Sequence, residues 1–338
     1  MIWRISLALV VLSFLIPCHG APGFDVEQIT MSETPLSSPN CIAYHPSGLW
    51  VVSDTGNDRV LLLDEDLRPV LEYSGDMLRP RGVAVDADGM IWICDSGNDR
   101  VLVLDENLEL FRILGEGSFD LPWGVSVGQG GVVAVSDSLN RRVQIFSANG
   151  SLLRSIGSWG TAPGQFDGPL DVAFNSDGRL VVVDAYLEAE GYLRRVQVFS
   201  PEYTLEQVIW DISNRLRFTR PVGVGTAPDG SIAVADFMAN RIYLFARDGS
   251  HLGGITRIEG HPDIKTPYDV AFAGTPGKDV VMGIVESDPG RVRLMRFSIS
   301  EPLGLLLTAV SLLLVKTEVR ALLRPVNRPA LDDSGPGR

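Results

Sequence analysis

The stretch that decides the fold extends from Pro80 to Gly115. It contains four short apolar runs: Pro80-Arg-Gly-Val-Ala-Val85, Asp88-Gly-Met-Ile-Trp-Ile-Cys-Asp95, Asn98-Asp-Arg-Val-Leu-Val-Leu104 and Leu108-Glu-Leu-Phe-Arg-Ile-Leu-Gly115. Runs of this length, rich in β-branched residues and separated by Gly, Asp and Asn, are typical of β-strands joined by tight turns. The stretch therefore predicts four consecutive strands in a meander.

The same pattern recurs six times. Each copy opens with a proline: Pro39, Pro80, Pro122, Pro169, Pro221 and Pro267. Each ends its second strand with an acid: Asp54, Asp95, Asp137, Asp184, Asp236 and Glu286. Each opens its third strand with an arginine: Arg59, Arg100, Arg142, Arg195, Arg241 and Arg291. Four-stranded sheets that bury neither face alone must stack on their neighbours. The sequence predicts an all-β, six-bladed propeller of four-stranded blades over residues 24–300.

The sixth copy lacks a fourth strand, because Pro302 follows soon after the run from Arg291 to Phe297. A run from Phe24 to Thr30 precedes the first copy and has no partner in a linear arrangement. Closing a sheet into a ring protects its edges. We therefore expect this N-terminal strand to complete blade six and close the ring.

Three passages resemble the NHL-repeat family of six-bladed propellers. They are Gly150–Gly157 with Gly164–Pro169, Asp137–Phe146, and Gly117–Pro122. The resemblance extends over residues 24–300 and implies the propeller fold. It does not imply one activity, because the family includes protein- and RNA-binding modules, sensor ectodomains and a zinc-dependent amidating lyase.

The N-terminus resembles a secretory signal peptide over residues 1–20. One basic residue, Arg4, precedes an apolar run from Ile5 to Ile16, and small residues follow at Gly20 and Ala21. This run is shorter than the roughly 20 residues of a membrane span. Cys18 leaves a lipoprotein alternative open. We expect the propeller to lie outside the cytoplasm, either secreted or membrane-anchored.

A second apolar run, Leu303 to Val315, precedes several basic residues near the C-terminus. It predicts a hydrophobic or amphipathic helix over residues 303–324, followed by a disordered tail over 325–338. Thirteen helical residues reach about 20 Å, less than the roughly 30 Å hydrocarbon core, although trailing basic side chains can extend the reach. A membrane tether and a helix packed on the domain both remain open.

The formal net charge of −13 makes nucleic acid an unexpected partner, because an acidic domain repels phosphate backbones. Downstream of the predicted signal peptide only Cys41 and Cys94 remain, too few for a disulfide framework. Two free thiols are expected, and a single disulfide is the alternative.

Catalytic and metal residues are not predicted. The repeated acid and arginine are interpreted as structural pairs, since a group required once for catalysis would not recur in every blade. The three histidines left after residue 20, His45, His251 and His261, lack the spacing of a zinc site. No Gly-x-Ser-x-Gly motif marks a nucleophilic serine.

The mouth of the central channel is the predicted ligand site, because the residues after each repeat proline begin the innermost strand. This predicted site combines aromatic, cationic, amide and acidic side chains: Asn40, Arg81, Trp123, Asp171, Tyr268 and Asp269. A few polar groups among apolar walls suit a ligand. Asp171 and Asp269 could equally be ordinary strand-start residues.

Blade four carries extra residues between its second and third strands. Four of them form the predicted interaction loop: Tyr186, Glu188, Glu190 and Tyr192. Insertions on a regular scaffold often carry specificity. The expected function is therefore binding of a protein, peptide or carbohydrate, without a cofactor. The alternative is a calcium-dependent hydrolase or lyase at the channel mouth, similar to a lactonase or an amidating lyase.

Overall fold

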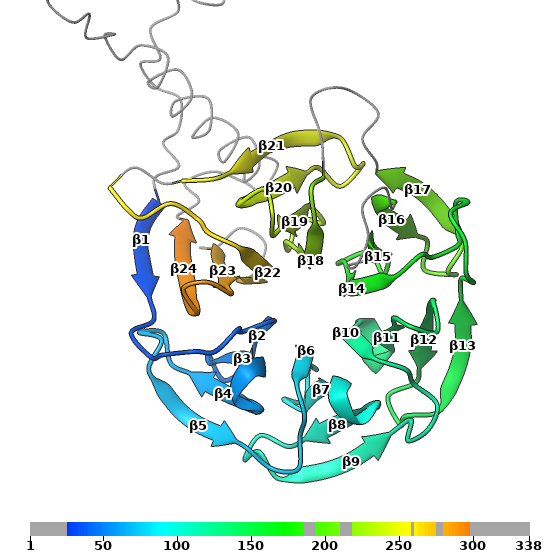
Figure 1. Ribbon diagram of the computed structural model, residues 1–338, viewed down its shortest axis with the longest axis horizontal. Helices are drawn as coiled ribbons and strands as arrows, with labels where there is room; N and C mark the ends of the chain where they lie inside the picture. The colour runs from blue at the N-terminus through cyan, green and yellow to red at the C-terminus, as the bar shows by residue number, and fades with distance from the viewer. Residues whose placement is uncertain (1–25, 186–192, 210–217, 258–259, 275–279, 298–338) are drawn as a thin grey trace, which may run out of the picture.

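A computed structural model describes residues 26–185, 193–209, 218–257, 260–274 and 280–297. In these residues 24 β-strands form six four-stranded antiparallel sheets, which surround a central axis like the blades of a wheel (Figure 1). The only helical segments in these ranges are three short 3-10 turns, Thr55–Asn57, Ser96–Asn98 and Gln129–Gly131. The predicted all-β, six-bladed propeller is confirmed.

The strands follow one another as the sequence repeat predicts. Blade one consists of β2 (Ile42–Tyr44), β3 (Trp50–Asp54), β4 (Arg59–Leu63) and β5 (Pro69–Tyr73). Blade two consists of β6 (Pro80–Val85), β7 (Ile91–Asp95), β8 (Arg100–Leu104) and β9 (Leu110–Leu114). Blade three consists of β10 (Pro122–Val127), β11 (Val133–Asp137), β12 (Arg142–Phe146) and β13 (Leu152–Ile156).

The remaining blades repeat this order. Blade four consists of β14 (Pro169–Phe174), β15 (Leu180–Ala185), β16 (Arg194–Phe199) and β17 (Leu205–Ile209). Blade five consists of β18 (Pro221–Thr226), β19 (Ile232–Asp236), β20 (Arg241–Phe245) and β21 (His251–Ile255). Blade six consists of β22 (Pro267–Ala273), β23 (Val280–Glu286), β24 (Arg291–Phe297) and β1 (Val26–Met31).

The N-terminal strand closes the ring, as predicted. β1 pairs antiparallel with β24, with Val26 opposite Phe297 and Met31 opposite Arg293. Ser32 extends this pairing, since its N–H donates to the carbonyl of Val292 at 2.9 Å and its hydroxyl accepts from the Val292 N–H at 3.0 Å. The first and last parts of the propeller are thus held in one sheet, so no blade is left with an unpaired fourth position.

Within a blade, the strands near the central axis are more buried than the outermost strand. The first strand of each blade lies at the axis and the fourth lies at the rim (Figure 1). β7, the second strand of blade two, is buried along its whole length, whereas β9 at the rim is mostly exposed. The continuous apolar second and third strands therefore supply the core between neighbouring blades.

The repeated acid links the hairpin between the second and third strands to the segment that precedes the first strand of the same blade. In blade two, Asp95 accepts the Leu78 N–H at 2.7 Å through Oδ1 and the Arg100 Nε–H at 2.8 Å through Oδ2. The matching acid–arginine ion pair occurs in five blades: Asp54–Arg59, Asp95–Arg100, Asp137–Arg142, Asp184–Arg195 and Glu286–Arg291. All five carboxylates are fully buried. Their shared geometry supports the structural interpretation.

Blade five departs from this pattern. Asp236 accepts three backbone N–H groups, from Thr219, Arg220 and Ala239, at 2.6, 2.8 and 3.1 Å. Arg241 lies over the ring of Tyr243, 5.4 Å from its centroid. Among the described residues Asp236 and Arg241 form no ion pair, so the expected acid–arginine pair is not found in this blade. Backbone amides, together with the charge of Arg194, stabilise the buried carboxylate instead.

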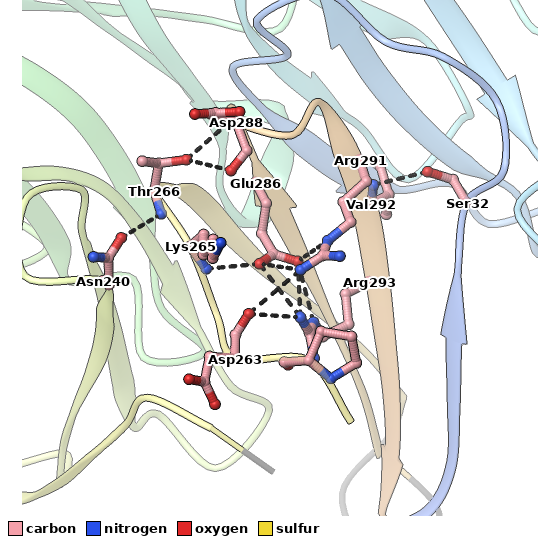
Figure 2. A network of polar contacts seen from close by, with 11 residues as sticks. Ser32, Asn240, Asp263, Lys265, Thr266, Glu286, Asp288, Arg291, Val292 and Arg293 are labelled. Carbon is pink, nitrogen blue, oxygen red and sulfur yellow. Dashed lines mark hydrogen bonds and ion pairs between the residues drawn. The ribbon is translucent and has the colours of Figure 1, made fainter. Parts of the chain in front are cut away.

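Blade six enlarges the pair into a network. Figure 2 shows Glu286 facing both Arg291 and Arg293, at 2.7 and 3.1 Å. Arg293 is fully buried, and its guanidinium also donates to the carbonyls of Pro262 and Asp263 at 2.9 and 3.4 Å. The glutamate, one methylene longer than the aspartate of the other blades, reaches a second arginine. Two charged partners and several carbonyls thus stabilise this buried site.

Several predictions fall on parts of the chain outside the described residues. These are the signal peptide at 1–20, the helix at 303–324, the tail at 325–338 and the loop residues Tyr186, Glu188, Glu190 and Tyr192. In the part of the chain that the structure describes, no helix has the length and apolarity needed to cross a membrane.

Candidate functional site

The inner strands turn at a bulge near the predicted site. In β10, Pro122 pairs with Asp137 of the next strand, and the register then shifts before Val125. The same irregularity follows the repeat proline in β6, β14, β18 and β22. A bulge leaves backbone amides free of ladder hydrogen bonds. A backbone amide in this region, that of Val224, donates to the Asp171 side chain at the axis.

Four of the predicted site residues form one layer at the axis, here called the guanidinium layer: Asn40, Arg81, Trp123 and Tyr268. The Arg81 guanidinium stacks on the Trp123 ring, 3.6 Å from its centroid, and donates to Asn40 Oδ1 at 3.4 Å. Burial lowers the pKa of Arg81, and a hydrogen bond with Tyr268 opposes this effect. Asn40 and Trp123 are buried, so this layer packs across the channel.

Asp171 and Asp269, here called the acid pair, form the next layer. Asp171 Oδ2 accepts the Val224 N–H at 2.8 Å, and Asp269 Oδ2 accepts the Ile42 N–H at 3.0 Å. Each carboxyl therefore reaches from its own blade to the inner strand of the following blade. The negative charge of Asp269 also acts on Asp171 electrostatically.

The environment of the acid pair favours protonation. Burial, followed by the neighbouring Asp269 carboxylate, raises the pKa of Asp171 well above its usual range. Burial also raises the pKa of Asp269 to about 6, although the hydrogen bond from the Ile42 N–H opposes the rise. Two close carboxyls in a buried site lose their protons one after the other. The acid pair therefore favours a singly protonated state over two full negative charges.

Cys41 contacts this layer from blade one. Its Sγ donates to the Val83 carbonyl at 3.5 Å, and burial together with the acid pair raises the pKa of its thiol. Cys41 and Cys94 are both free and buried. The single disulfide that the sequence left as an alternative is therefore not formed.

A glycine on the blade before each acid makes room for its carboxyl. A Cβ added to Gly124 would lie 2.4 Å from Asp171 Oδ1, and one added to Gly223 would lie 2.8 Å from Asp269 Oδ1. Such distances are well inside van der Waals contact. The carboxyls therefore occupy space that only glycine leaves open.

A cavity of about 620 Å³, here called the axial cavity, begins at the acid pair and extends along the inner strands. Asp171, Asp269 and Cys41 lie at one end, and Tyr44, Thr226 and Gly274 contribute to the other. The wall between them is made of short apolar side chains from all six blades. The six residues predicted to form one site therefore fall into two groups. The acid pair lines the axial cavity, and the guanidinium layer does not.

Two segments of the chain match a known repeat. The family model described as NHL repeat matches residues 77–104 and 119–146, which fall on blades two and three. These segments lie in a closed ring of six four-stranded antiparallel blades. The chain is a six-bladed propeller with NHL repeats. No curated protein matches this propeller in sequence.

Solved structures resemble the propeller in fold. A gluconolactonase from Xanthomonas campestris is 16% identical, with a TM-score of 0.58 and coverage of 84% of this chain and 99% of that chain. A virginiamycin B lyase from Staphylococcus aureus is 11% identical, with a TM-score of 0.54 and coverage of 80% and 100%. A protein of unknown function from Bacteroides thetaiotaomicron is 17% identical, with a TM-score of 0.60 and coverage of 79% and 71%. At such identities the likeness extends to the fold alone.

The donor set of the propeller does not suit a calcium ion. In the described ranges, no three acidic, histidine or cysteine side chains are placed to hold a metal. Each member of the acid pair also uses one oxygen on a backbone amide. Calcium takes six to eight oxygen ligands. His45, the histidine nearest the inner strands in sequence, is occupied by Ser47 Oγ and the Gly89 carbonyl at 2.6 and 3.0 Å.

A second pocket, of about 420 Å³, adjoins the axial cavity at the seam where the ring closes. Tyr44, Ala273 and Gly274 line both spaces. Gln28 of β1 and Arg296 of β24 line the second pocket alone. Sequence analysis missed this pocket, because it combines residues from the two ends of the propeller that meet only through ring closure.

Proposed function

We propose that this NHL-repeat propeller is a ligand-binding protein that works outside the cytoplasm and holds its ligand in the axial cavity. The observation that carries the proposal is the acid pair at the end of an otherwise mostly apolar space of about 620 Å³. Apolar walls supply affinity, and a few convergent polar groups supply orientation. The ligand is a small molecule, or a side chain or sugar unit that enters from a larger partner.

The experiment is a fragment screen by ligand-observed NMR, repeated with two variants that fill the space. Ala43 and Ala271 are half-buried wall residues of the axial cavity, so Ala43→Phe and Ala271→Phe each occupy part of it. Fragments that bind the wild-type propeller should lose binding in both variants, while circular dichroism shows that both remain folded. Binding that survives in both variants, or no binding fragment at all, would contradict the proposal.

The location outside the cytoplasm is supported by the signal-peptide pattern of residues 1–20. Fractionation of cells that express the full chain should recover a shortened protein outside the cytoplasm, with its N-terminus near Ala21. Cytoplasmic protein that retains Met1 would contradict this location. Comparing the full chain with residues 1–301 tests whether the Leu303–Val315 run acts as a tether, because only the full chain should then fractionate with membranes.

Partner capture through the blade-four loop remains a proposal that rests on sequence alone. Deleting Leu187 to Tyr192 should abolish recovery of a partner from the native host, while the melting temperature stays nearly unchanged. Recovery of the same partner by the deletion variant would remove this loop from the binding surface.

A hydrolase or lyase is the second candidate. The fold likeness to a gluconolactonase and a virginiamycin B lyase supports it, and two carboxyls that share a proton can serve as acid and base. Gluconolactone hydrolysis by the purified propeller, with and without calcium, tests this candidate. Turnover that disappears in Asp171→Asn and Asp269→Asn would favour the enzyme over the binding protein.

A further inference from the structure

The second pocket, of about 420 Å³ and here called the seam pocket, lies where blade six meets blade one. On its blade-six side the β-ladder places Gln28 of β1 opposite Arg296 of β24, and Thr30 opposite Leu294. Residues two apart on a strand share one face of the sheet, so these four side chains lie on the same face. The blade-one side consists of Tyr44, Trp50, Glu65 and Asp66. Because β1 supplies part of the wall, the seam pocket is complete only in the closed ring.

Arg296 stands where the repeat has a different kind of residue. Five residues after the third-strand arginine, blades one to four carry a side chain that accepts a backbone N–H of the following turn: Asp64, Asp105, Ser147 and Ser200. β24 instead continues through this position and ends at Phe297. The turn-capping role of this position is therefore absent in blade six, and an arginine side chain faces the seam pocket in its place.

The Arg296 guanidinium is accessible to a ligand. Its side chain is 39% exposed. Among the described residues its ionic partner is Glu65, which is 81% exposed, with Nη2 and Oε2 3.9 Å apart. This distance exceeds that of a hydrogen bond, and an exposed ion pair stabilises a protein little. Binding a ligand therefore requires no strong contact of Arg296 to be broken.

An aromatic floor crosses the seam pocket. Tyr44 is 39% exposed, and its ring meets the Trp50 ring edge-on, with the centroids 5.1 Å apart. Trp50 is buried against Gly283 of blade six, where a Cβ would lie 2.8 Å from the Trp50 Cζ3 atom. The glycine lets the Trp50 ring extend across the seam, and Tyr44 supplies the aromatic surface that a ligand can reach. An aromatic ring with a polar tip suits a ligand that is apolar on one face and polar at its edge.

The charges that line the seam pocket have both signs. Arg296 contributes a positive charge, and Glu65 and Asp66 contribute negative charges. Arg68 offsets one of these, since its Nη1 lies 2.6 Å from Asp66 Oδ2. The carboxylates would repel an anion in the pocket, and the guanidinium would repel a cation. The lining therefore favours a neutral molecule that uses both donors and acceptors.

We propose that the seam pocket binds a neutral sugar, one hexopyranose unit. This second site is separate from the axial cavity and goes beyond the proposed function. A hexopyranose has apolar C–H groups on the faces of its ring and hydroxyl groups around its edge. Its C–H face packs on Tyr44, and its hydroxyls accept from Arg296 and donate to Glu65. Gln28 and Thr30 add a donor and acceptors from β1. A volume of about 420 Å³ is within the range of small-molecule sites.

The test is a ligand-observed NMR titration of the full-length propeller at pH 6.0. The probes are D-glucose, D-galactose and D-mannose, each beside its 2-amino derivative, a cation at this pH, and its 6-carboxylate derivative, an anion. At least one neutral hexose should bind, and at least about tenfold more tightly than both of its charged derivatives. No binding of any neutral hexose overturns the inference. Tighter binding of a charged derivative, or of the zwitterion L-phenylalanine, overturns it as well.

Variants locate the bound sugar. Arg296→Met and Tyr44→Ala should each weaken binding of the neutral hexose at least about tenfold, which corresponds to about 1.4 kcal/mol. Arg112→Met removes another partly exposed arginine, from β9 at the rim of blade two, and should keep the wild-type affinity. Thermal melts verify that all three variants fold. Wild-type affinity in Arg296→Met or in Tyr44→Ala overturns the inference. Fragments held in the axial cavity should still bind Arg296→Met, so the proposed function and this second site can fail separately.

Discussion

Replacing Asp269 by asparagine should make the propeller more stable at neutral pH. The asparagine oxygen can still accept the Ile42 N–H, and its amide can donate toward Asp171. The charge, however, is removed from a site where burial raises the pKa of Asp269 from an ordinary 3.8 to about 6. Burial, the largest cause of the raised pKa of Asp171, is unchanged in the variant, whereas the repulsion from Asp269 is removed.

The sign follows from proton linkage. A carboxyl whose pKa is higher in the folded state binds its proton more tightly there. The stabilising contribution of Asp269 to the free energy of unfolding is fully present below pH 4 and is lost as the pH rises through about 6. A difference of about two pKa units corresponds to roughly 3 kcal/mol of unfolding free energy. The wild type should lose this amount at Asp269 between pH 4 and pH 7.5, in addition to the loss at Asp171. Asp269→Asn keeps only the loss at Asp171, so its stability should fall less steeply with pH.

The assay is urea unfolding of both proteins at pH 4.5 and pH 7.5. Asp184→Asn is the matched control, because Asp184 is equally buried but forms an ion pair with the fully buried Arg195 at 2.9 Å. Breaking that pair should destabilise the protein by about 3–5 kcal/mol. An Asp269→Asn protein that is less stable than the wild type at pH 7.5, or that keeps the wild-type pH dependence, would refute the reasoning.

Three further outcomes are expected. Gly124→Ala should lower the unfolding free energy by about 1–3 kcal/mol in urea titrations, because its Cβ would crowd Asp171; wild-type stability would contradict the packing of the acid pair. Deleting Val26–Met31 should lower it by about 3–5 kcal/mol, since several β-ladder hydrogen bonds are lost; an unchanged midpoint would contradict ring closure. The buried thiols of Cys41 and Cys94 should react with Ellman's reagent only after unfolding; fast labelling of the native protein would show that they are exposed.

The fold was predictable because its signals are local and repeated. In blade two, Pro80 opens the inner strand, Asp95 ends the second and Arg100 opens the third, and each of these roles was evident from spacing. Ring closure was predictable from an unpaired run and an incomplete sheet. The strand itself is Val26–Met31, close to the predicted Phe24 to Thr30.

The candidate site was only partly predictable. The sequence predicted that Arg81 and Asp269 lie in one site at the channel mouth. In the structure Arg81 belongs to the guanidinium layer, which packs across the channel, whereas Asp269 lines the axial cavity. The bulges after the repeat prolines and the width of the closed ring decide this separation. Neither can be derived from the sequence of one strand. The role of Gly124 and Gly223 was missed for the same reason, since it depends on the approach of a neighbouring blade.

The contrast between two kinds of buried acid supports a role in binding for the acid pair. Asp95 has a backbone donor and an arginine, so its charge is balanced within one blade. Asp269 has one backbone amide from the next blade and a neighbouring acid that raises the pKa of the pair member Asp171. Where a buried carboxylate stabilises a hairpin, as Asp95 does, the chain places an arginine beside it. At the axis it leaves Asp269 without an arginine. A structural role alone would favour an arginine beside Asp269 or an apolar residue in its place, because a buried carboxylate without a cationic partner is costly.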